Sequence, residues 1–279
     1  MTRENEPQTD GYEAVRWAMD DGIGVLTLHR PEKRNALNAR MREEIADVVA
    51  RVRQDRALKA LVINGAGGAF CAGGDLAALE AVRGDLEGAR ARIRALHTWF
   101  PELVNLEKPV IAAVDGPAFG AGFMLALAAD FVLASSRASF CAVFARIGLV
   151  PDLGAFWLLP RILGLQRAKE LAMTARTVGV DEARSLGIVL EIHPPEQLMH
   201  RAMAFAGRFR HASTVALGMT KSAMNQSFNL DQRALAEMEA FAQAIAINGS
   251  DHRAAVDCFL SKQPLDFDWD RMDREEGAR

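Results

Sequence analysis

Short apolar runs alternate with segments of helical periodicity over the first 190 residues of the chain. The runs are flanked mostly by charged or turn-forming residues, a pattern that predicts buried strands. We expect five such strands, over residues 23–29, 60–65, 109–116, 130–135 and 139–144. Strands that alternate with helices are typical of an α/β architecture with crossover connections.

Three segments between these runs predict helices. The first begins after Asn38, a good N-cap, and places five apolar residues on one face: Met41, Ile45, Val48, Val49 and Val52. The second covers roughly residues 88–104. The third opens in the glycine-rich segment 116–123 and ends before Asp130.

Beyond residue 195 the pattern is almost entirely helical. Ser250 can cap a helix that runs to Lys262, and a long apolar stripe precedes it, formed by Leu235, Met238, Phe241, Ala242 and Ile245. No repeat and no linker rich in Pro, Gly or Ser interrupts the chain. We therefore expect a flexible N-terminus over 1–14, an α/β core over 15–195 and a helical region over 196–279.

Composition and charge narrow the class of protein. The 279 residues are 50% hydrophobic and 25% charged, and a formal net charge of −3 gives no electrostatic case for nucleic acid or anionic membranes. The three cysteines form no CxxC and the six histidines form no HxxxH pair, so we expect no metal site and a reducing compartment. The N-terminus lacks an apolar signal core and no apolar run is long enough to span a bilayer, which favours a cytoplasmic protein.

Two glycine-rich loops follow apolar runs, NGAGGAFCAGGD at 64–75 and DGPAFGAGF at 115–123. Neither matches GxGxxG, and neither is followed by GK[ST], so neither is a nucleotide-binding loop by pattern. Glycines let backbone N–H groups approach a ligand closely, and two such donors can stabilise an oxyanion. Two tight turns with no further role are the alternative explanation.

Four motifs give the chain a resemblance to a known family: HRPEKRNALN at 29–38, FCAGGDL at 70–76, GPAFGAGF at 116–123 and ARIGLVPDLG at 145–154. Over residues 15–265 the chain resembles the crotonase family, also called the enoyl-CoA hydratase/isomerase superfamily. The resemblance implies a spiral of repeated ββα units with a C-terminal helical extension. It also implies homotrimers or dimers of trimers assembled through that extension. The implied substrate is an acyl-CoA thioester that carries the coenzyme A itself, with no prosthetic group.

The resemblance assigns roles to particular residues. The two oxyanion amides map onto Gly74 and Ala121. Eight further residues are expected at the CoA moiety: Lys33, Ala36, Leu37, Ala72, Asp75, Leu76, Phe259 and Lys262. Two of them, Phe259 and Lys262, are expected to reach it from a neighbouring subunit. A solvated charge is the alternative for Lys33, helix packing for Phe259, and a structural role for Asp75.

Hydratases of this family use two glutamates, and their positions here hold Met124 and Phe144. Neither side chain can activate water or donate a proton, so hydration is disfavoured. Asp152 remains, in PDLGAFWLLPR, a context similar to the ring-epoxide isomerases of phenylacetate breakdown. One base suffices to move a proton from C2 to C4, and burial would raise the pKa of an aspartate above its reference value of ~3.9. The resemblance therefore favours an acyl-CoA isomerase that uses Asp152 as base and either moves a double bond or rearranges a ring-derived CoA ester.

Several alternatives stay open for the same residues. Asp152 can cap a helix instead, or act as the nucleophile of a dehalogenase-like enzyme. The chain can also be a hydratase-like enzyme or a catalytically silent acyl-CoA-binding protein. Phe70, Met124 and Phe144 are expected to shape an acyl pocket, with core packing as the alternative. Cys71 is expected to be a small buried residue, and Asp115 and Asp130 turn or cap residues.

Overall fold

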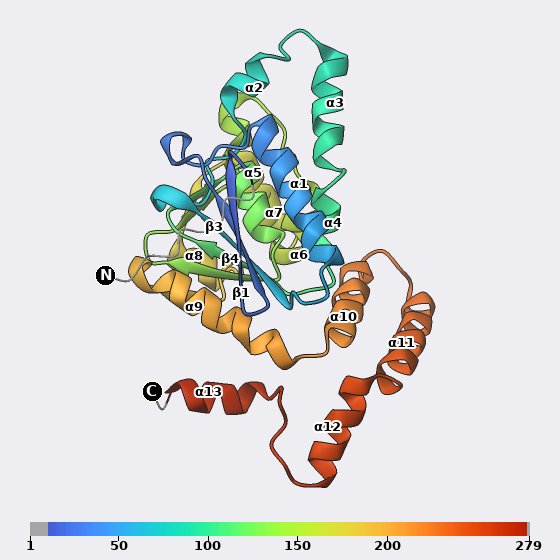
Figure 1. The fold of residues 1–279 in the computed structure, drawn as a ribbon. Coiled ribbons are helices and arrows are strands. Elements are labelled where there is room, and N and C mark those ends of the chain that lie inside the picture. Colours follow the sequence, from blue (N-terminus) through green and yellow to red (C-terminus); the bar gives the residue numbers. More distant parts are fainter. Residues whose placement is uncertain (1–10, 278–279) are drawn as a thin grey trace, which may run out of the picture.

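The computed structural model describes residues 11–277 and is built on a six-stranded sheet in the order β1-β2-β3-β4-β6-β9 (Figure 1). Its strands are β1 (Val15–Asp20), β2 (Ile23–Leu28), β3 (Ala60–Gly65), β4 (Val110–Val114), β6 (Phe131–Ser135) and β9 (Glu191–His193). All neighbours pair in parallel except β1 and β2. The predicted α/β class and four of the predicted strands are confirmed in this sheet.

Strand β1 is an element that the sequence analysis missed. It forms a hairpin with β2 across Asp21 and Gly22, whose φ angles are 43° and 78°. Two positive φ values suit an Asp-Gly turn, whose twist matches the flanking strands. That dipeptide, placed before an apolar run, was the signal available in the sequence.

A small second sheet has the order β5-β7-β8 and contains β5 (Pro117–Phe119), β7 (Ser139–Cys141) and β8 (Thr177–Gly179). The strand predicted over 139–144 is therefore shorter than expected. It ends at Cys141, and a 3-10 helix, η3 (Val143–Ile147), follows.

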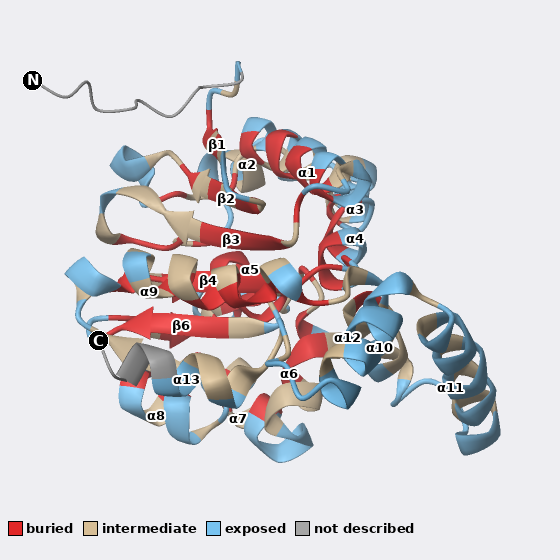
Figure 2. Cartoon of the chain, turned by 60° about the horizontal axis from the view of Figure 1, so that its bottom comes forward, coloured by how far each residue is buried: buried red, intermediate tan, exposed pale blue. Residues whose placement is uncertain are grey.

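Alternate residues of the central strands enter two separate cores. In β3, Leu61 and Ile63 belong to the larger core, whereas Ala60 and Val62 belong to the smaller one. The larger core lies under α1 (Ala39–Gln54) and α5 (Ala121–Leu127), and the smaller one under α9 (Pro195–Gly207). Figure 2 shows the central strands as buried. Burial on both faces explains why these strands read as continuous apolar runs.

The remaining helices surround this sheet or extend beyond it. They are α2 (Leu76–Glu80), α3 (Leu86–Leu96), α4 (Phe100–Val104), α6 (Ala155–Leu163), α7 (Leu165–Thr174), α8 (Val180–Ser185), α10 (Thr214–Gln226), α11 (Gln232–Ile247), α12 (Ser250–Leu260) and α13 (Trp269–Gly277). The helix after Asn38 is confirmed, since the Asn38 side chain accepts a hydrogen bond from the Met41 amide.

Two predicted helix boundaries are wrong. The helix expected over 88–104 is broken between α3 and α4, because Pro101 has no N–H for a continuing helix and stands in the first turn of α4. Ser250 is the first residue of α12 and not its cap. The cap is Gly249, which makes no side-chain hydrogen bond.

The C-terminal helices form an arm that leaves the sheet and then returns (Figure 1). Lys221 of α10 attaches the arm to the core by donating to Asp130 at 2.7 Å. At the far end, Trp269 packs edge-on against Phe205 of α9, with ring centroids 5.2 Å apart. Between them, α11 and α12 contain no buried residue. Within the predicted apolar stripe on α11, Phe241 and Ile245 are exposed in the single chain and the other three residues are half-buried. Assembly through this arm stays a prediction.

None of the helices within 11–277 is both long and apolar enough to cross a membrane. Residues 1–10 of the N-terminus expected to be flexible lie outside the described residues.

Candidate active site

A cleft of about 520 Å³ opens where the loops after β2, β3 and β5 meet. Because parallel strands end at one edge of a sheet, the loops that follow them gather there, and ligands of open α/β sheets bind at this edge. The lining includes residues of these loops, of α1 and α3, and of the segment after β7: Lys33, Ala36, Leu37, Arg42, Ala72, Gly73, Gly74, Asp75, Leu76, Arg92, Ala121, Phe144, Leu149 and Asp152.

The amide of Gly74 faces away from the segment around Leu37, which pairs with it. The Leu37 amide donates to the Gly73 carbonyl at 2.8 Å, and the Asp75 amide donates to the Leu37 carbonyl at 3.2 Å. These bonds form a parallel bridge between Leu37 and Gly74, so the N–H of Gly74 itself points to the other side.

Ala121 is the first residue of α5, and its amide stands beside the same loop. Its nitrogen lies 3.6 Å from the place that a Cβ on Gly73 would occupy. Among residues 11–277, neither the Gly74 amide nor the Ala121 amide donates a hydrogen bond to a protein acceptor. Two adjacent backbone donors are therefore available in the cleft wall.

Glycine is required where the two loops touch. A Cβ on Gly122 would lie 2.2 Å from the Cys71 carbonyl oxygen, and a Cβ on Gly73 would lie 2.9 Å from the Phe119 oxygen. The loops are joined directly as well, since the Phe119 amide donates to the Cys71 carbonyl at 2.9 Å. The small residues of both motifs thus hold the two amides close together.

Asn35, which sequence reasoning passed over, fastens the third loop. Its side chain is fully buried and its backbone is left-handed, with φ 57°. Its amide nitrogen donates to the carbonyls of Ala66 and Ala69, and its side-chain oxygen accepts from the Arg30 amide. Asparagine tolerates this conformation better than most residues, which was the available signal.

Asp75 has a structural partner at each carboxylate oxygen. It pairs with Arg30 at 2.9 Å and caps α2 by accepting from the Ala77 amide at 3.1 Å. The Arg30 hydrogen bond, more than any other contact, lowers the pKa of Asp75. Asp75 lines the cleft, but its charge is already neutralised.

Asp152 reaches the cleft from the loop before α6. Its Oδ1 is buried and has no hydrogen-bond partner among the described residues, while Oδ2 lies 3.9 Å from the Arg92 guanidinium. Burial raises the pKa of Asp152, and the nearby Arg92, His97 and Arg42 only partly offset this.

The helix-cap alternative for Asp152 is wrong. Helix α6 starts at Ala155 behind Gly154, with no side-chain cap bond. Leu153, which lies between Asp152 and Gly154, is fully buried and has a φ of 47°. This conformation is uncommon for leucine, and it sets the direction of the backbone at Asp152.

Two arginines in the cleft were not predicted. Arg42 projects from α1 and Arg92 from α3, and both line the cleft together with Asp152. Arg42 donates to the Asn38 carbonyl of its own helix at 3.1 Å. Both helices carry several arginines, so only the packing of the helices shows which of them face the cleft.

The predicted acyl pocket needs correction. Phe144 lines the cleft, but Phe70 and Met124 are fully buried and do not. Helix α5 is buried over its whole length, so its second turn, including Met124, packs into the core. Phe70 likewise packs into the larger core beneath the loop.

Other predicted residues separate into cleft, core and arm. Lys33, Ala36, Leu37, Ala72 and Leu76 line the cleft as a group, and their contact with CoA stays a prediction. Cys71 is buried as expected, and burial raises the pKa of its thiol to about 12. Phe259 lies in the last turn of α12 and Lys262 just beyond its end, and neither lines this cleft. Their role at a neighbouring subunit stays a prediction.

Asp115 and Asp130 were expected to be turn or cap residues, and both have structural partners, although neither caps a helix within residues 11–277. Asp115 accepts from Arg137 at 2.7 Å, and Asp130 accepts from the Val110 amide at 2.8 Å.

Comparison with protein families gives one match that covers most of the chain. Residues 18–270 match the family model described as enoyl-CoA hydratase/isomerase.

Curated relatives carry both hydratase and isomerase names. A probable enoyl-CoA hydratase of Rhodobacter capsulatus is 37% identical over 92% of this chain and 98% of its own length. The 1,2-epoxyphenylacetyl-CoA isomerase of Escherichia coli K12 is 34% identical over 89% of this chain and 96% of its own. The chain is thus similar at comparable levels to proteins named for two reactions.

Solved structures confirm the predicted fold. An enoyl-CoA hydratase/isomerase from Cupriavidus metallidurans CH34 superposes with a TM-score of 0.86 at 41% identity, covering 92% of this chain and 96% of that one. The crotonase-like fold with a C-terminal helical extension is therefore shown.

Proposed function

Because the chain belongs to the enoyl-CoA hydratase/isomerase family, we propose that it isomerises an acyl-CoA ester by moving a double bond within the acyl group. Asp152 is the base, and the amides of Gly74 and Ala121 hold the thioester oxygen. The observation that carries the proposal is that the cleft holds both a buried carboxylate oxygen, Oδ1 of Asp152, and two backbone N–H groups, none of which has a hydrogen-bond partner among residues 11–277.

The proposed reaction conserves atoms and charge. The Asp152 carboxylate removes a proton from C2, the C–H electron pair forms the C1–C2 double bond, and the carbonyl electrons move onto oxygen. The two amides stabilise that negative oxygen, an effect typically worth ~10²–10³ in rate for each donor. When the carbonyl reforms, a C2–C3 double bond replaces the original C3–C4 bond, and C4 takes the proton from Asp152.

The charge state of Asp152 suits this role. A carboxylate with a raised pKa is a stronger base, which abstraction from carbon requires. The other carboxylate of the cleft, Asp75, is paired with Arg30 and has a lowered pKa. The positions of the two glutamates expected in hydratases hold Met124, which is buried in the core, and Phe144. One acid supports proton transfer within a substrate better than the addition of water.

The names of the relatives support the family chemistry and leave the two reactions to experiment. The Escherichia coli relative is named an isomerase, and its name is consistent with the proposal. The hydratase names make water addition the outcome to test against.

The test is a panel of 3-enoyl, 2-enoyl, dienoyl and aromatic-ring-derived CoA esters, assayed with wild type and Asp152→Asn. We expect isomerisation of at least one ester, and a loss of kcat in the variant by about 10²–10⁴, the usual contribution of a positioned base. Circular dichroism and calorimetric binding of a saturated acyl-CoA should be unchanged.

Asp181→Asn is a matched control, because Asp181 is exposed on α8 and does not line the cleft. Full activity of Asp152→Asn would reject the assignment of the base. Hydration of 2-enoyl-CoA as the dominant activity of the wild type would reject the isomerase proposal.

A further inference from the structure

Two arginines face the proposed substrate cleft with too few anionic partners. Arg42 and Arg92 both line it, and burial together with the positive charge of nearby Arg92 lowers the pKa of Arg42, which Glu43 and Asp152 only partly offset. The Arg92 side chain is 17% exposed, so water solvates it only in part. Cations taken out of water need anions or hydrogen-bond acceptors to replace the lost solvation.

The hydrogen bonds of these arginines leave most of their donors unused. A guanidinium has five N–H donors. Among residues 11–277, the Arg42 side chain donates one hydrogen bond, from Nε to the Asn38 carbonyl. Within the same part of the chain, Arg92 has one ionic contact, to Asp152 at 3.9 Å, which is longer than a hydrogen bond.

The carboxylates of the cleft cannot neutralise both arginines. Asp152 carries at most one negative charge, and Asp75 is already paired with Arg30. With Asp152 ionised the group of Arg42, Arg92 and Asp152 has a net charge of +1, and with Asp152 protonated it has +2. A ligand that enters here meets an excess of positive charge.

The position of the pair relates it to the acyl group. Arg92 and Asp152 also line a second cavity of about 950 Å³, together with His97 and apolar residues such as Leu149. Lys33, Ala36 and Leu37, three of the residues expected at the CoA moiety, line only the first cleft, as Arg42 does, whereas Leu76 lines both cavities. Arg92 therefore stands on the side of Asp152 that continues away from those three residues, and Arg42 lies in the first cleft, near enough to feel the charges of Arg92 and Asp152.

We propose that the acyl group carries a second acid group, a carboxylate, which binds between the guanidinium groups of Arg42 and Arg92. Arginine suits this task because its planar fork binds a carboxylate through two parallel hydrogen bonds. The preferred substrate is then a CoA ester of a dicarboxylic acid. The inference deepens the proposed function and rests on it only in placing a CoA ester in this cleft.

The experiment measures binding without turnover, so it does not depend on the role of Asp152. Calorimetry compares succinyl-CoA with butyryl-CoA, and glutaryl-CoA with pentanoyl-CoA, each pair matched in chain length. We expect the esters with a free carboxylate to bind at least about tenfold tighter to the wild type. The preference should fall to within about twofold in Arg42→Met and Arg92→Met, with butyryl-CoA affinity retained.

Arg94→Met is the matched control, because Arg94 lies exposed on the same helix as Arg92 and does not line the cleft. Arg92→Lys is a second variant that keeps the charge, and it should lose only part of the preference because it cannot bind a carboxylate through a fork. Circular dichroism confirms that each variant is folded.

Three results would overturn the inference. Equal affinity of the wild type for both members of each pair would show that no acid group is recognised. Equal losses for both members and for free CoA in the two arginine variants would place the CoA phosphates, and not the acyl group, at the arginines. A preference that survives in Arg42→Met and Arg92→Met would place the recognition elsewhere. If the preference follows the arginines but Asp152→Asn remains fully active, the proposed base fails and the acyl-group inference stands.

Discussion

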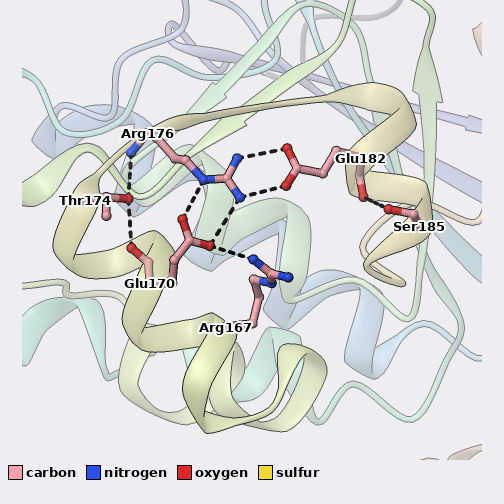
Figure 3. Close-up of polar contacts among 6 residues, drawn as sticks. All are labelled: Arg167, Glu170, Thr174, Arg176, Glu182 and Ser185. Carbon is pink, nitrogen blue, oxygen red and sulfur yellow. Dashed lines mark hydrogen bonds and ion pairs between the residues drawn. The ribbon is translucent and has the colours of Figure 1, made fainter.

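Two groups of charged residues in this molecule differ in how completely their arginines are paired. Arg176, between α7 and α8, donates from all three guanidinium nitrogens to Glu170 and Glu182, at distances of 2.5 to 3.2 Å (Figure 3). In the cleft, Arg42 and Arg92 both lie near Asp152, but only Arg92 makes an ionic contact with it, at 3.9 Å. Carboxylates of the chain occupy all three nitrogens of the Arg176 guanidinium, whereas Arg42 and Arg92 keep N–H donors for a ligand.

The pKa values of the acids in the two groups move in opposite directions. Hydrogen bonds from Arg176 lower the pKa of Glu170 and of Glu182, so both stay ionised at neutral pH. Burial raises the pKa of Asp152, although two arginines lie nearby. In an ion-pair network that only joins two helices, the carboxylates stay ionised. A site that moves protons needs an acid that can both release a proton and take one up.

The largest effect is expected from a substitution that opens the wall of the cleft. In Gly122→Ala the new Cβ would stand 2.2 Å from the Cys71 oxygen, and backbone must move to relieve the clash. We expect the two oxyanion amides to separate, with kcat/KM lower by about 10²–10³ and stability lower by about 1–3 kcal/mol. Steady-state kinetics and thermal unfolding measure both.

The matched control lies beside the Arg176 group. Gly179 ends β8, and no atom lies within 4 Å of the place that a Cβ on it would occupy. Gly179→Ala should therefore leave kcat/KM unchanged, and its effect on stability should not exceed about 1 kcal/mol, the typical cost of alanine at a helix N-cap such as this one. Wild-type activity in Gly122→Ala would show that the contact between the two glycine loops does not hold the amides in place.

A smaller effect is expected on the pH dependence of the reaction. Arg92 favours the ionised form of Asp152, so Arg92→Met should raise the pKa of Asp152 further. Because the base must be ionised, kcat/KM rises with pH through this pKa, and the rise should move to higher pH in the variant. The measurement is kcat/KM against pH with an uncharged acyl group, so that recognition of a second acid does not enter.

Arg176→Met provides the comparison for this profile, since its carboxylates lie outside the cleft lining. We expect its pH profile to coincide with that of the wild type. An unshifted profile in Arg92→Met would mean that another group controls the rate, and it would remove the contrast between the two arginine groups.

The sequence predicted the buried scaffold more completely than the segments near its ends. Continuous apolar runs identified the central strands because both faces of the sheet are covered. The strand at Val15–Asp20 was missed, because it lies at the edge of the sheet and its last two positions, Met19 and Asp20, are exposed. The helix over 88–104 was predicted as one element because its periodicity outweighed Pro101.

Within the site, sequence motifs located backbone better than side chains. Gly74, Ala121 and Asp152 fall in one cleft because their motifs follow strands that end at one edge. Met124 and Phe70 were assigned to a pocket although they are core, since an apolar residue reads the same in either place. Arg42 and Arg92 could not be distinguished from neighbouring arginines until α1 and α3 were packed together.

The smallest effect is expected from removing the ion pairs of Arg176 with Glu170 and Glu182. Arg176→Met should lower the midpoint of thermal unfolding slightly at pH 7 and leave activity unchanged, because exposed ion pairs contribute little. The pKa values of Glu170 and Glu182 are lowered from 4.5, so the stability they gain from Arg176 is fully present above pH 4.5. It is lost as the pH falls through their folded-state pKa values, where both become protonated.

The difference in unfolding midpoint between wild type and Arg176→Met should therefore disappear in acid, and should also shrink at high salt, which screens exposed charges. Thermal unfolding of both proteins across pH and salt tests this, with the exposed Arg94→Met variant as control. A difference that persists in acid would mean that Arg176 acts by packing its stem between α7 and α8. In that case the four hydrogen bonds of Arg176 would not account for its contribution to stability. The contrast with the cleft would then rest on Arg42 and Arg92 alone.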